Sequence, residues 1–283
     1  MGAGAEGGLA GVDAAELDRV ERRFWRECWE AVPEEARRRH GVVLRRFGPV
    51  QATLARDLPT SGMMNLVLGA TEPGALEDGH LESALELAAE LGVRPYVPVS
   101  PGPRSAAVEE WLRERGFTRG YGWMKFVRDP HPPRFRVAED VEVVELRPGD
   151  EDPIGMIAAT AFEMPAWAAA FFADMAGRPG WRCYVARLGG EPQACGMMLI
   201  DAGIAQLAIA ATLEPGRGRG CQLALLDRRI RDAAAAGCRT LFVETGERVP
   251  GRPSVSYRNI LRAGFREAYV RPNWVPGAGA DGE

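Results

Sequence analysis

The sequence predicts an α/β (α+β) protein of two domains, and three observations support this prediction. The chain has 283 residues, enough for two domains of ordinary size, and 46% of them are apolar, which suffices for a core in each. Segments with the apolar spacing of strands and of helices alternate through both halves. A turn rich in glycine and arginine joins a strand to a helix in the second half, at residues 214–220.

The second half contains a series of segments whose apolar residues follow the period of a strand or a helix. Their predicted order is strand, two helices, three strands, helix, strand, helix, strand. The segments lie at residues 141–146, 153–164, 166–176, 181–188, 194–200, 206–213, 223–233, 241–243, 256–261 and 265–270. Pro165 separates the first two helices, and Gly264 ends the last one.

The first half predicts a similar order and is interpreted as a diverged copy of the second. Residues 107–117 predict a helix followed by Gly116 and a strand at 121–127, as residues 257–265 do around Gly264. The two glycines lie about one domain length apart, which is typical of a duplicated domain rather than of a solenoid. The other segments are a helix, two strands, a helix and a proline-interrupted strand, at residues 17–28, 42–56, 63–70, 81–91 and 94–99.

The boundary between the domains is expected in the proline-rich stretch 129–133, which cannot propagate a helix. The prediction is a first domain of residues 12–133 and a second of residues 134–276, between disordered tails at 1–11 and 277–283. The glycine-rich start has neither the basic nor the apolar region of a signal peptide.

Composition and charge argue against several classes of protein. No apolar run is long enough for a membrane span. The five cysteines and three histidines are scattered, so neither a disulfide framework nor a metal site is expected, and a reducing cytoplasm is the expected location. The net charge of −4 argues against a nucleic-acid partner. Lys125 is the only lysine among 35 basic residues, a bias that indicates a GC-rich, bacterial genome.

The turn between the strand 206–213 and the next helix is the most informative motif. The turn and the start of the helix consist of Arg217, Gly218, Arg219, Gly220, Cys221 and Gln222. Glycines allow a ligand to approach the backbone closely, and the first amides of a helix have no intrahelical partner. The helix dipole and the two guanidinium groups add positive charge at the same place. The motif therefore predicts a site for a diphosphate.

Three known diphosphate motifs can be compared with this turn. A Walker A loop is excluded because no Gly-Lys-Ser/Thr follows. A dinucleotide fingerprint fits poorly because the third glycine is missing, although Glu244 stands where a ribose-binding acid would be. The pattern Arg-x-x-Gly-x-Gly/Ala is matched at Arg217 and Gly220, with Gln222 in place of the final small residue. An ordinary glycine-rich turn with two solvated arginines stays open as the alternative.

The third pattern resembles the acyl-coenzyme A loop of the GNAT N-acetyltransferase superfamily. The order of elements over roughly half of the chain is similar to the GNAT fold, and Arg262-Ala-Gly-Phe265 resembles the family's helix-to-strand junction. The resemblance implies two GNAT-like domains, each a mixed and mainly antiparallel sheet flanked by helices. It also implies acetyl-coenzyme A (acetyl-CoA) as the co-substrate, and no metal.

The resemblance further implies where acetyl-CoA would lie. Backbone groups near Ala210, Ala211 and Thr212 would pair with the pantetheine arm, and an amide there would be the oxyanion donor. Asn259 could contact the pantetheine or the cofactor tail.

Only the second domain is expected to bind acetyl-CoA. In the first domain Glu72, Glu77 and Asp78 stand where the second has Arg217 and Arg219, and carboxylates repel a diphosphate. The first domain is expected to wall the acceptor pocket and to support the fold.

Three residues are candidates for proton transfer. Glu244 follows the strand 241–243 near the expected cleft, and Glu163 lies at the break between helices that lines the acceptor pocket in relatives. Either carboxylate could attract a cationic amine and relay its proton through water, and either could be a solvated surface residue. The family's usual tyrosine position is Ile260 here, and Tyr257, one turn earlier, could protonate the leaving thiolate instead.

The predicted function is transfer of an acetyl group from acetyl-CoA to a primary amine of a small molecule or peptide by direct attack. An alternative, favoured by Ile260, is a non-catalytic acyl-CoA-binding sensor or assembly module. Two further kinds of relative stay open. One is a tandem protein that transfers aminoacyl groups from tRNA, which would need a basic face that is not visible here. The other is an acetyltransferase of low-molecular-weight thiol biosynthesis. The sequence predicts neither the acceptor nor the oligomeric state, and it predicts no membrane or nucleic-acid partner.

Overall fold

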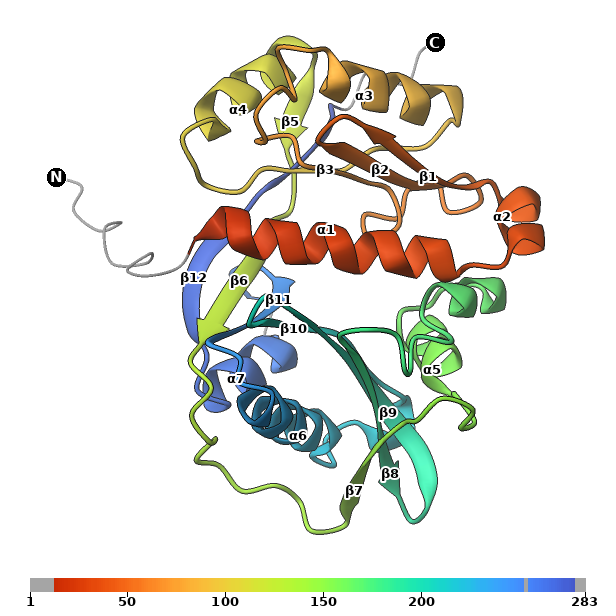
Figure 1. Ribbon diagram of the computed structural model, residues 1–283, viewed down its shortest axis with the longest axis vertical. Helices are drawn as coiled ribbons and strands as arrows, with labels where there is room; N and C mark the ends of the chain where they lie inside the picture. The colour runs from red at the N-terminus through yellow and green to blue at the C-terminus, as the bar shows by residue number, and fades with distance from the viewer. Residues whose placement is uncertain (1–12, 252–253, 278–283) are drawn as a thin grey trace, which may run out of the picture. The chain divides into compact units, whose positions relative to one another are not determined.

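The computed structural model describes residues 13–251 and 254–277, and these form two compact units. The N-terminal unit comprises Asp13–Trp123 and the segment that begins at Tyr269, and the C-terminal unit comprises Met124–Ala268. Figure 1 shows strands and helices in each unit, which confirms the predicted α/β class. Among the described residues, every helix is too short or too polar to cross a bilayer.

The C-terminal unit is built on a seven-stranded sheet in the order β12-β6-β11-β10-β9-β8-β7. Its strands are β6 (Trp123–Arg128), β7 (Val141–Glu145), β8 (Trp181–Leu188), β9 (Glu191–Asp201), β10 (Ile204–Thr212), β11 (Thr240–Gly246) and β12 (Arg266–Arg271). Neighbours from β7 to β10 run antiparallel, and β10 pairs with β11 in parallel. The sheet is therefore mixed and mainly antiparallel, as predicted.

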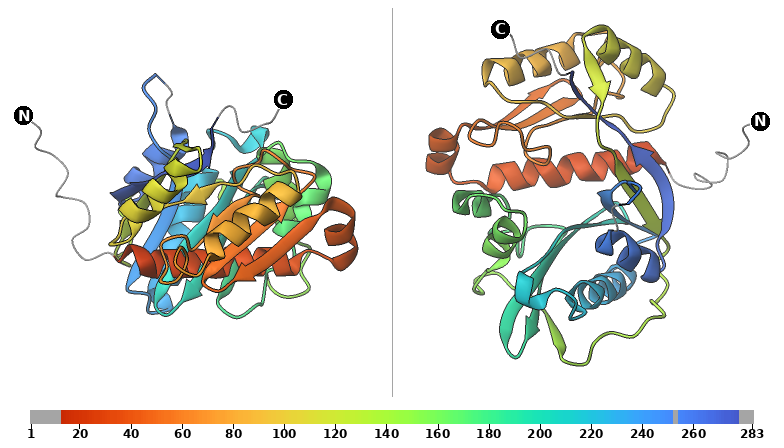
Figure 2. Two further views of the ribbon diagram at one scale, coloured as in Figure 1. Left: turned by 90° about the horizontal axis from the view of Figure 1, so that it is seen from above. Right: turned by 180° about the vertical axis from the view of Figure 1, so that it is seen from behind.

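Helices cover both faces of this sheet. Figure 1, and the view from behind in Figure 2, show α6 (Cys221–Ala235) and α7 (Val255–Arg262) on one face and α5 (Ile154–Ala161) on the other. The apolar side of α6, including Leu226 and Ile230, shares one buried core with strand residues such as Leu207. This packing holds the first turn of α6 next to the end of β10.

The second predicted helix, residues 166–176, is a short 3₁₀ helix instead, η1 (Ala166–Phe171). Its amides bond three residues back, from Ala168 to Pro165 at 2.9 Å and from Phe172 to Ala169 at 3.1 Å. Phe171 and Phe172 of this segment are buried, but an apolar run alone does not distinguish an α-helix from a tighter turn.

The N-terminal unit contains two three-stranded sheets, β1-β2-β3 and β4-β13-β5, and a parallel bridge between Leu66 and Tyr96 joins them. The strands are β1 (Val42–Phe47), β2 (Val50–Ala55), β3 (Leu66–Leu68), β4 (Val97–Pro98), β5 (Phe117–Arg119) and β13 (Asn273–Pro276). The helices are α1 (Ala14–Ala31), α2 (Glu34–His40), α3 (His80–Glu90) and α4 (Ser105–Glu114). The expected single strand 42–56 is two strands, because Gly48, with a φ of 49°, turns the chain between them.

Each half of the chain contributes its last strand to the sheet formed mainly by the other half. β6 follows α4 and β5 in sequence but lies between β12 and β11 of the C-terminal unit. β13 follows α7 and β12 but pairs with β4 and β5, with Trp274 opposite Val97 and Arg119. The order β1-β2-β3-β4-β13-β5 thus corresponds to β8-β9-β10-β11-β6-β12, in agreement with the interpretation of a duplicated domain.

The compact units differ from the expected linear domains of residues 12–133 and 134–276. The proline-rich stretch 129–133 follows β6 and lies inside the C-terminal unit. The sheet to which a strand belongs is decided by its hydrogen bonds to neighbouring strands. A proline-rich stretch shows only where a helix cannot continue, so it does not indicate that sheet. The expected tails at 1–11 and 278–283 lie outside the described residues. Gly277, expected in the second tail, donates its amide to Gly116 O at 2.9 Å.

A buried ion pair lies within the N-terminal unit and joins its C-terminal segment to α1. Arg271 Nη2 donates to Glu21 Oε1 at 2.8 Å, and the two side chains are 3% and 1% exposed. Trp25 Nε1 donates to the same carboxylate at 3.4 Å. The segment that carries β13 is therefore fixed by a charged contact as well as by strand pairing.

Candidate functional site

The sheet of the C-terminal unit opens between β10 and β11. Parallel pairing of the two strands ends at Leu207 and Val243, although both strands continue. Ala210, Ala211 and Thr212, the residues expected beside a pantetheine arm, lie beyond this point. In the described structure they belong to the part of β10 that no longer pairs with β11. Backbone groups on such an edge are available to a ligand.

β10 bulges where it leaves β11. Ala208 pairs with Met197 and Ala211 with Cys195, so β10 has one residue more than β9 between these pairs. Ile209, inside the bulge, has a φ of 45°, a left-handed conformation that is rare for a β-branched residue. Such strain is concentrated at functional sites and persists only where the surroundings enforce it.

Two buried side chains bond the carbonyl groups of the bulge. Arg229 Nη1 donates to Met197 O at 3.1 Å and to Ala208 O at 3.3 Å, and Cys195 Sγ donates to Ile209 O at 3.7 Å. Burial lowers the pKa of Arg229 to about 10, so its guanidinium remains charged at neutral pH. The sequence analysis missed Arg229; the available signal was an arginine at an apolar position of the helical period.

The glycine–arginine turn lies between β10 and α6, as predicted. Gly218 and Gly220 have φ angles of 75° and 88°, which favour glycine. A Cβ atom at Gly218 would meet nothing within 4 Å, so the turn is open on that side. The first backbone bond of α6 runs from Ala224 N to Gly220 O at 3.0 Å. The amides of Cys221 and Gln222 donate to no backbone oxygen of a described residue.

The two arginines of the turn have different surroundings. Arg219 Nη2 lies 2.8 Å from Asp140 Oδ2, and both side chains are more than half exposed. Arg217 is exposed and forms no ion pair with any residue that the structure describes. Arg217 therefore supplies the uncompensated charge of the turn, in addition to the positive end of the α6 dipole.

The structure brings together two residues that were predicted separately. Asn259 Nδ2 donates to Gln222 Oε1 at 2.7 Å, and Gln222 Nε2 donates to Ser256 Oγ at 3.0 Å. These bonds join the start of α6 to α7. Cys221 is buried beside them, and burial raises the pKa of its thiol, as expected for a packing residue rather than a nucleophile.

Glu244 lies on β11 directly after the last residue that pairs with β10. It forms an ion pair with Lys125 of β6, and the two side chains are 12% and 0% exposed. Lys125 Nζ also lies 5.5 Å from the centre of the Phe242 ring. No role for Lys125 follows from the sequence, where its only signal is that it is the sole lysine.

The other two candidates for proton transfer have different surroundings. The Tyr257 hydroxyl donates to Glu267 Oε1 at 2.6 Å, and its ring packs edge-to-face on Phe126 with 4.7 Å between the centroids. Burial and this hydrogen bond raise the pKa of Tyr257 to about 12. Glu163 is exposed after the end of α5, has a φ of 55° and donates its amide to Thr160 O.

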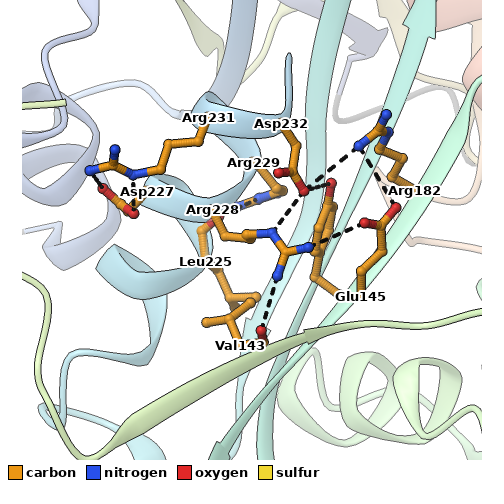
Figure 3. A network of polar contacts seen from close by, with 10 residues as sticks. Val143, Glu145, Arg182, Leu225, Asp227, Arg228, Arg229, Arg231 and Asp232 are labelled. Carbon is orange, nitrogen blue, oxygen red and sulfur yellow. Dashed lines mark hydrogen bonds and ion pairs between the residues drawn. The ribbon is translucent and has the colours of Figure 1, made fainter. Parts of the chain in front are cut away.

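A polar network holds α6 against β7 and β8 (Figure 3). Arg228 donates to Asp232 Oδ2 at 2.8 Å and to Glu145 Oε2 at 3.3 Å, and the Tyr184 hydroxyl donates to Asp232 Oδ2 at 2.9 Å. Arg182 Nη1 lies 3.9 Å from Glu145 Oε1 and 3.8 Å from Asp232 Oδ2. Burial and the neighbouring Asp232 raise the pKa of Tyr184. The network fixes the helix that begins at the glycine–arginine turn.

The corresponding turn of the N-terminal unit, before α3, is built differently. Glu72 Oε1 accepts a hydrogen bond from Arg22 Nη1 at 2.5 Å, and Asp78 is exposed. The amide of Leu81, in the first turn of α3, donates to Ala75 O at 2.8 Å. The exposed carboxylate of Asp78 and the internal bonding of the Leu81 amide therefore both oppose anion binding at this turn.

Comparison with known proteins finds a family model that matches part of the chain and solved structures with a similar fold. Residues 132–247 match the family model described as an acetyltransferase (GNAT) domain. The chain is similar to the structure of a GCN5-related N-acetyltransferase from Kribbella flavida, with 18% identity, a TM-score of 0.62 and coverage of 95% of this chain and 98% of that one.

Two further solved structures are similar. A GCN5-related N-acetyltransferase from Sphaerobacter thermophilus has 16% identity, a TM-score of 0.55 and coverage of 81% and 78%. A tandem GNAT protein from the clavulanic acid biosynthesis pathway has 17% identity, a TM-score of 0.55 and coverage of 93% and 95%. No curated protein sequence matches the chain. At these identities the structural likeness shows the fold.

Proposed function

Because residues 132–247 match the model of an acetyltransferase (GNAT) domain, we propose that the chain transfers an acetyl group from acetyl-CoA to a primary amine of a small molecule or peptide. The proposal rests mainly on one observation. Within the C-terminal unit, the sheet opens between β10 and β11, and β10 leads through the short 3₁₀ helix η2 (Glu214–Gly216) to the glycine–arginine turn at the start of α6.

The diphosphate of acetyl-CoA is proposed to lie on the turn. Arg217 offers a charge that no described carboxylate neutralises, and the amides of Cys221 and Gln222 are available as donors. The pantetheine arm would then extend along residues 210–212, where it would pair with backbone groups as an added strand does. An amide of this segment would donate to the oxyanion that develops on the thioester carbonyl.

Glu244 is the proposed general base, acting through water. Its carboxylate lies just beyond the last pair of β10 and β11, and the ammonium group of Lys125 stabilises its negative charge. The substrate ammonium loses a proton to this base, and the freed electron pair attacks the thioester carbonyl. The carbon–sulfur bond then breaks, the attacking nitrogen gives up its second proton to solvent to leave a neutral amide, and coenzyme A departs as a thiolate that takes a proton from solvent.

Glu163 and Tyr257 stay as rival candidates within the same proposal. Glu163 is exposed and could take up a proton from a substrate bound near α5. Tyr257 could protonate the thiolate only after its hydroxyl leaves Glu267. Neither group is held in the opening between β10 and β11 by a described contact, which is why Glu244 is preferred.

The proposal is tested by titration calorimetry with acetyl-CoA, followed by measurement of thiol release in the presence of a panel of primary amines. We expect binding in the range of about 1 μM to 1 mM that is typical of enzyme substrates, and thiol release that depends on an amine. The absence of any heat with acetyl-CoA would contradict the proposal at its first step.

A non-catalytic acyl-CoA-binding sensor is the second candidate, and a specific observation favours it. Ile260 is only 1% exposed and stands at the position of the family's usual tyrosine, while the Tyr257 hydroxyl is bonded to Glu267. Tight binding of acetyl-CoA without thiol release for any amine in the panel would support the sensor.

The proposal also includes a cytoplasmic location, because all five cysteines are buried free thiols, as is usual in reducing compartments. It includes no metal, nucleic-acid or membrane partner, which the net charge of −4 and the scattered histidines support.

A further inference from the structure

The buried cation Arg229 contacts the bulge of β10. Its side chain is fully buried, and Nη1 donates to both Met197 O and Ala208 O. Met197 and Ala208 form the last regular pair of β9 and β10 before the bulge, and the strained Ile209 follows immediately. Arg229 thus bonds both strands at the position where their register changes.

Burial of the Arg229 guanidinium is unfavourable in free energy. Among the described residues no carboxylate pairs with it, and its Nη2 atom has no hydrogen-bond partner. A buried guanidinium without a counter-ion loses its hydration without regaining it from an ion pair. An apolar side chain of similar volume would serve packing at least as well.

The neighbouring strand is adapted to this side chain. A Cβ atom at Gly196 would lie 2.9 Å from Arg229 Cζ, so a side chain at that position of β9 would displace the guanidinium. Arg229 also donates from Nε to Leu225 O of its own helix at 3.1 Å, which fixes the direction of the side chain. The guanidinium is therefore held between α6 and the two strands.

We propose that Arg229 is a positioning residue for the acyl-donor site: by bonding Ala208 O it holds the bulge in register and so fixes the backbone of residues 210–212. The inference rests on the proposed function for the role of residues 210–212 in acetyl-CoA binding. The effect of Arg229 on the backbone itself does not depend on that function.

The experiment compares the full chain with R229M, R229K and G196A, and uses R231M as the matched control. Arg231 lies on the same helix, is more than half exposed and pairs with Asp227, away from the Arg228 network (Figure 3). Three quantities are measured for each protein: the melting temperature, hydrogen exchange of the backbone amides in residues 206–213, and KM and kcat with acetyl-CoA.

In R229M we expect a melting temperature within about 4 °C of that of the wild type. Hydrogen exchange should accelerate about tenfold or more in residues 206–213 and not elsewhere. KM for acetyl-CoA should rise about tenfold, because the backbone that binds the co-substrate is no longer fixed. R229K should restore part of the affinity because an ammonium can still donate to the two carbonyl groups. G196A, which retains Arg229 but displaces it, should resemble R229M, and R231M should resemble the wild type.

Two results would overturn the inference. If hydrogen exchange and KM in R229M equal those of the wild type, the bulge keeps its register without Arg229. If exchange accelerates throughout the C-terminal unit, Arg229 only stabilises the fold. If R229M does not fold, hydrogen exchange and KM of R229K and G196A test the inference by the same criteria. If the wild type itself does not bind acetyl-CoA, the proposed function fails, whereas locally accelerated exchange in R229M still supports the role of Arg229 in fixing the bulge.

Discussion

Lys125, the only lysine of the chain, forms a buried ion pair with Glu244, the first residue of β11 beyond its pairing with β10. β6, which carries Lys125, is the strand that the first half of the chain contributes to the C-terminal sheet. The exchanged strand therefore does more than complete the sheet: it supplies the counter-ion of the proposed general base.

Replacement of Glu244 by Gln preserves the size of the side chain and removes its charge. We expect kcat to fall about 100-fold or more, with little change in KM for acetyl-CoA, because a general base acts in the chemical step. The measurement is kcat as a function of pH, with the melting temperature recorded to show that the fold survives. E163Q is the matched comparison; a large loss in E163Q with normal turnover in E244Q would move the base to Glu163.

Replacement of Arg217 by Ala should weaken acetyl-CoA binding about tenfold or more, because its charge is not shared with a described carboxylate. R219A should have a smaller effect, since Asp140 already neutralises Arg219. Both effects should shrink with added salt, which screens exposed charges. Calorimetry at two salt concentrations measures the affinities, with R231A as a control for the loss of an exposed arginine. Unchanged binding in R217A would show that the turn does not bind acetyl-CoA.

Replacement of Tyr257 by Phe tests whether this tyrosine is catalytic or structural. We expect kcat to stay within about twofold and the free energy of unfolding to fall by about 1 kcal/mol, the usual value of a lost hydrogen bond. The folded-state pKa of Tyr257, about 12, lies above the unfolded value of 10.0. The contribution of the Tyr257 hydroxyl to the free energy of unfolding is therefore fully present below pH 10 and is lost as the pH rises towards 12. The stability difference between wild type and Y257F should therefore shrink between about pH 9 and pH 12 in urea denaturation. A large fall in kcat at neutral pH would instead assign Tyr257 to the chemistry.

The buried pair of Arg271 and Glu21, which lies in the N-terminal unit, predicts a large effect on stability. Replacement of Arg271 by Met leaves the Glu21 carboxylate buried without its cation, and we expect a loss of about 3–5 kcal/mol in the free energy of unfolding. Arg266, exposed on the same strand, is the matched control, and R266M should change stability by less than about 0.5 kcal/mol. Urea denaturation measures both variants; equal stabilities would show that strand pairing alone fixes this segment.

Local patterns in the sequence predicted the parts of the fold that depend on local interactions. The alternation in residues 181–188 corresponds to β8, and the glycines at positions 218 and 220 form the open turn before α6. The acidic substitutions at Glu72 and Asp78 also lie where the duplication placed them, before α3. In each case the signal lies within a few residues of the feature that it predicts.

Contacts between distant segments could not be predicted in the same way. The strand at 121–127 was expected from its own apolar residues, but its place beside β11 depends on hydrogen bonds to a sheet far along the chain. The pairing of Lys125 with Glu244 follows from that placement, and so escaped the sequence analysis. Arg229 escaped it for a different reason: an arginine at an apolar helix position is usually read as a surface residue whose stem covers the core.

The contrast between the two turns predicts that one chain binds a single molecule of acetyl-CoA. At α6 the turn offers Arg217 and unbonded amides, whereas at α3 Glu72 is bonded to Arg22 and the Leu81 amide is bonded to Ala75. Calorimetry with the full chain should give one site, and R217A should weaken that site without exposing a second. Neutralising the acidic turn with E72Q and D78N should not add a site, because the amide bond to Ala75 persists. Two sites in the wild type would show that the N-terminal unit binds acetyl-CoA despite its negative turn.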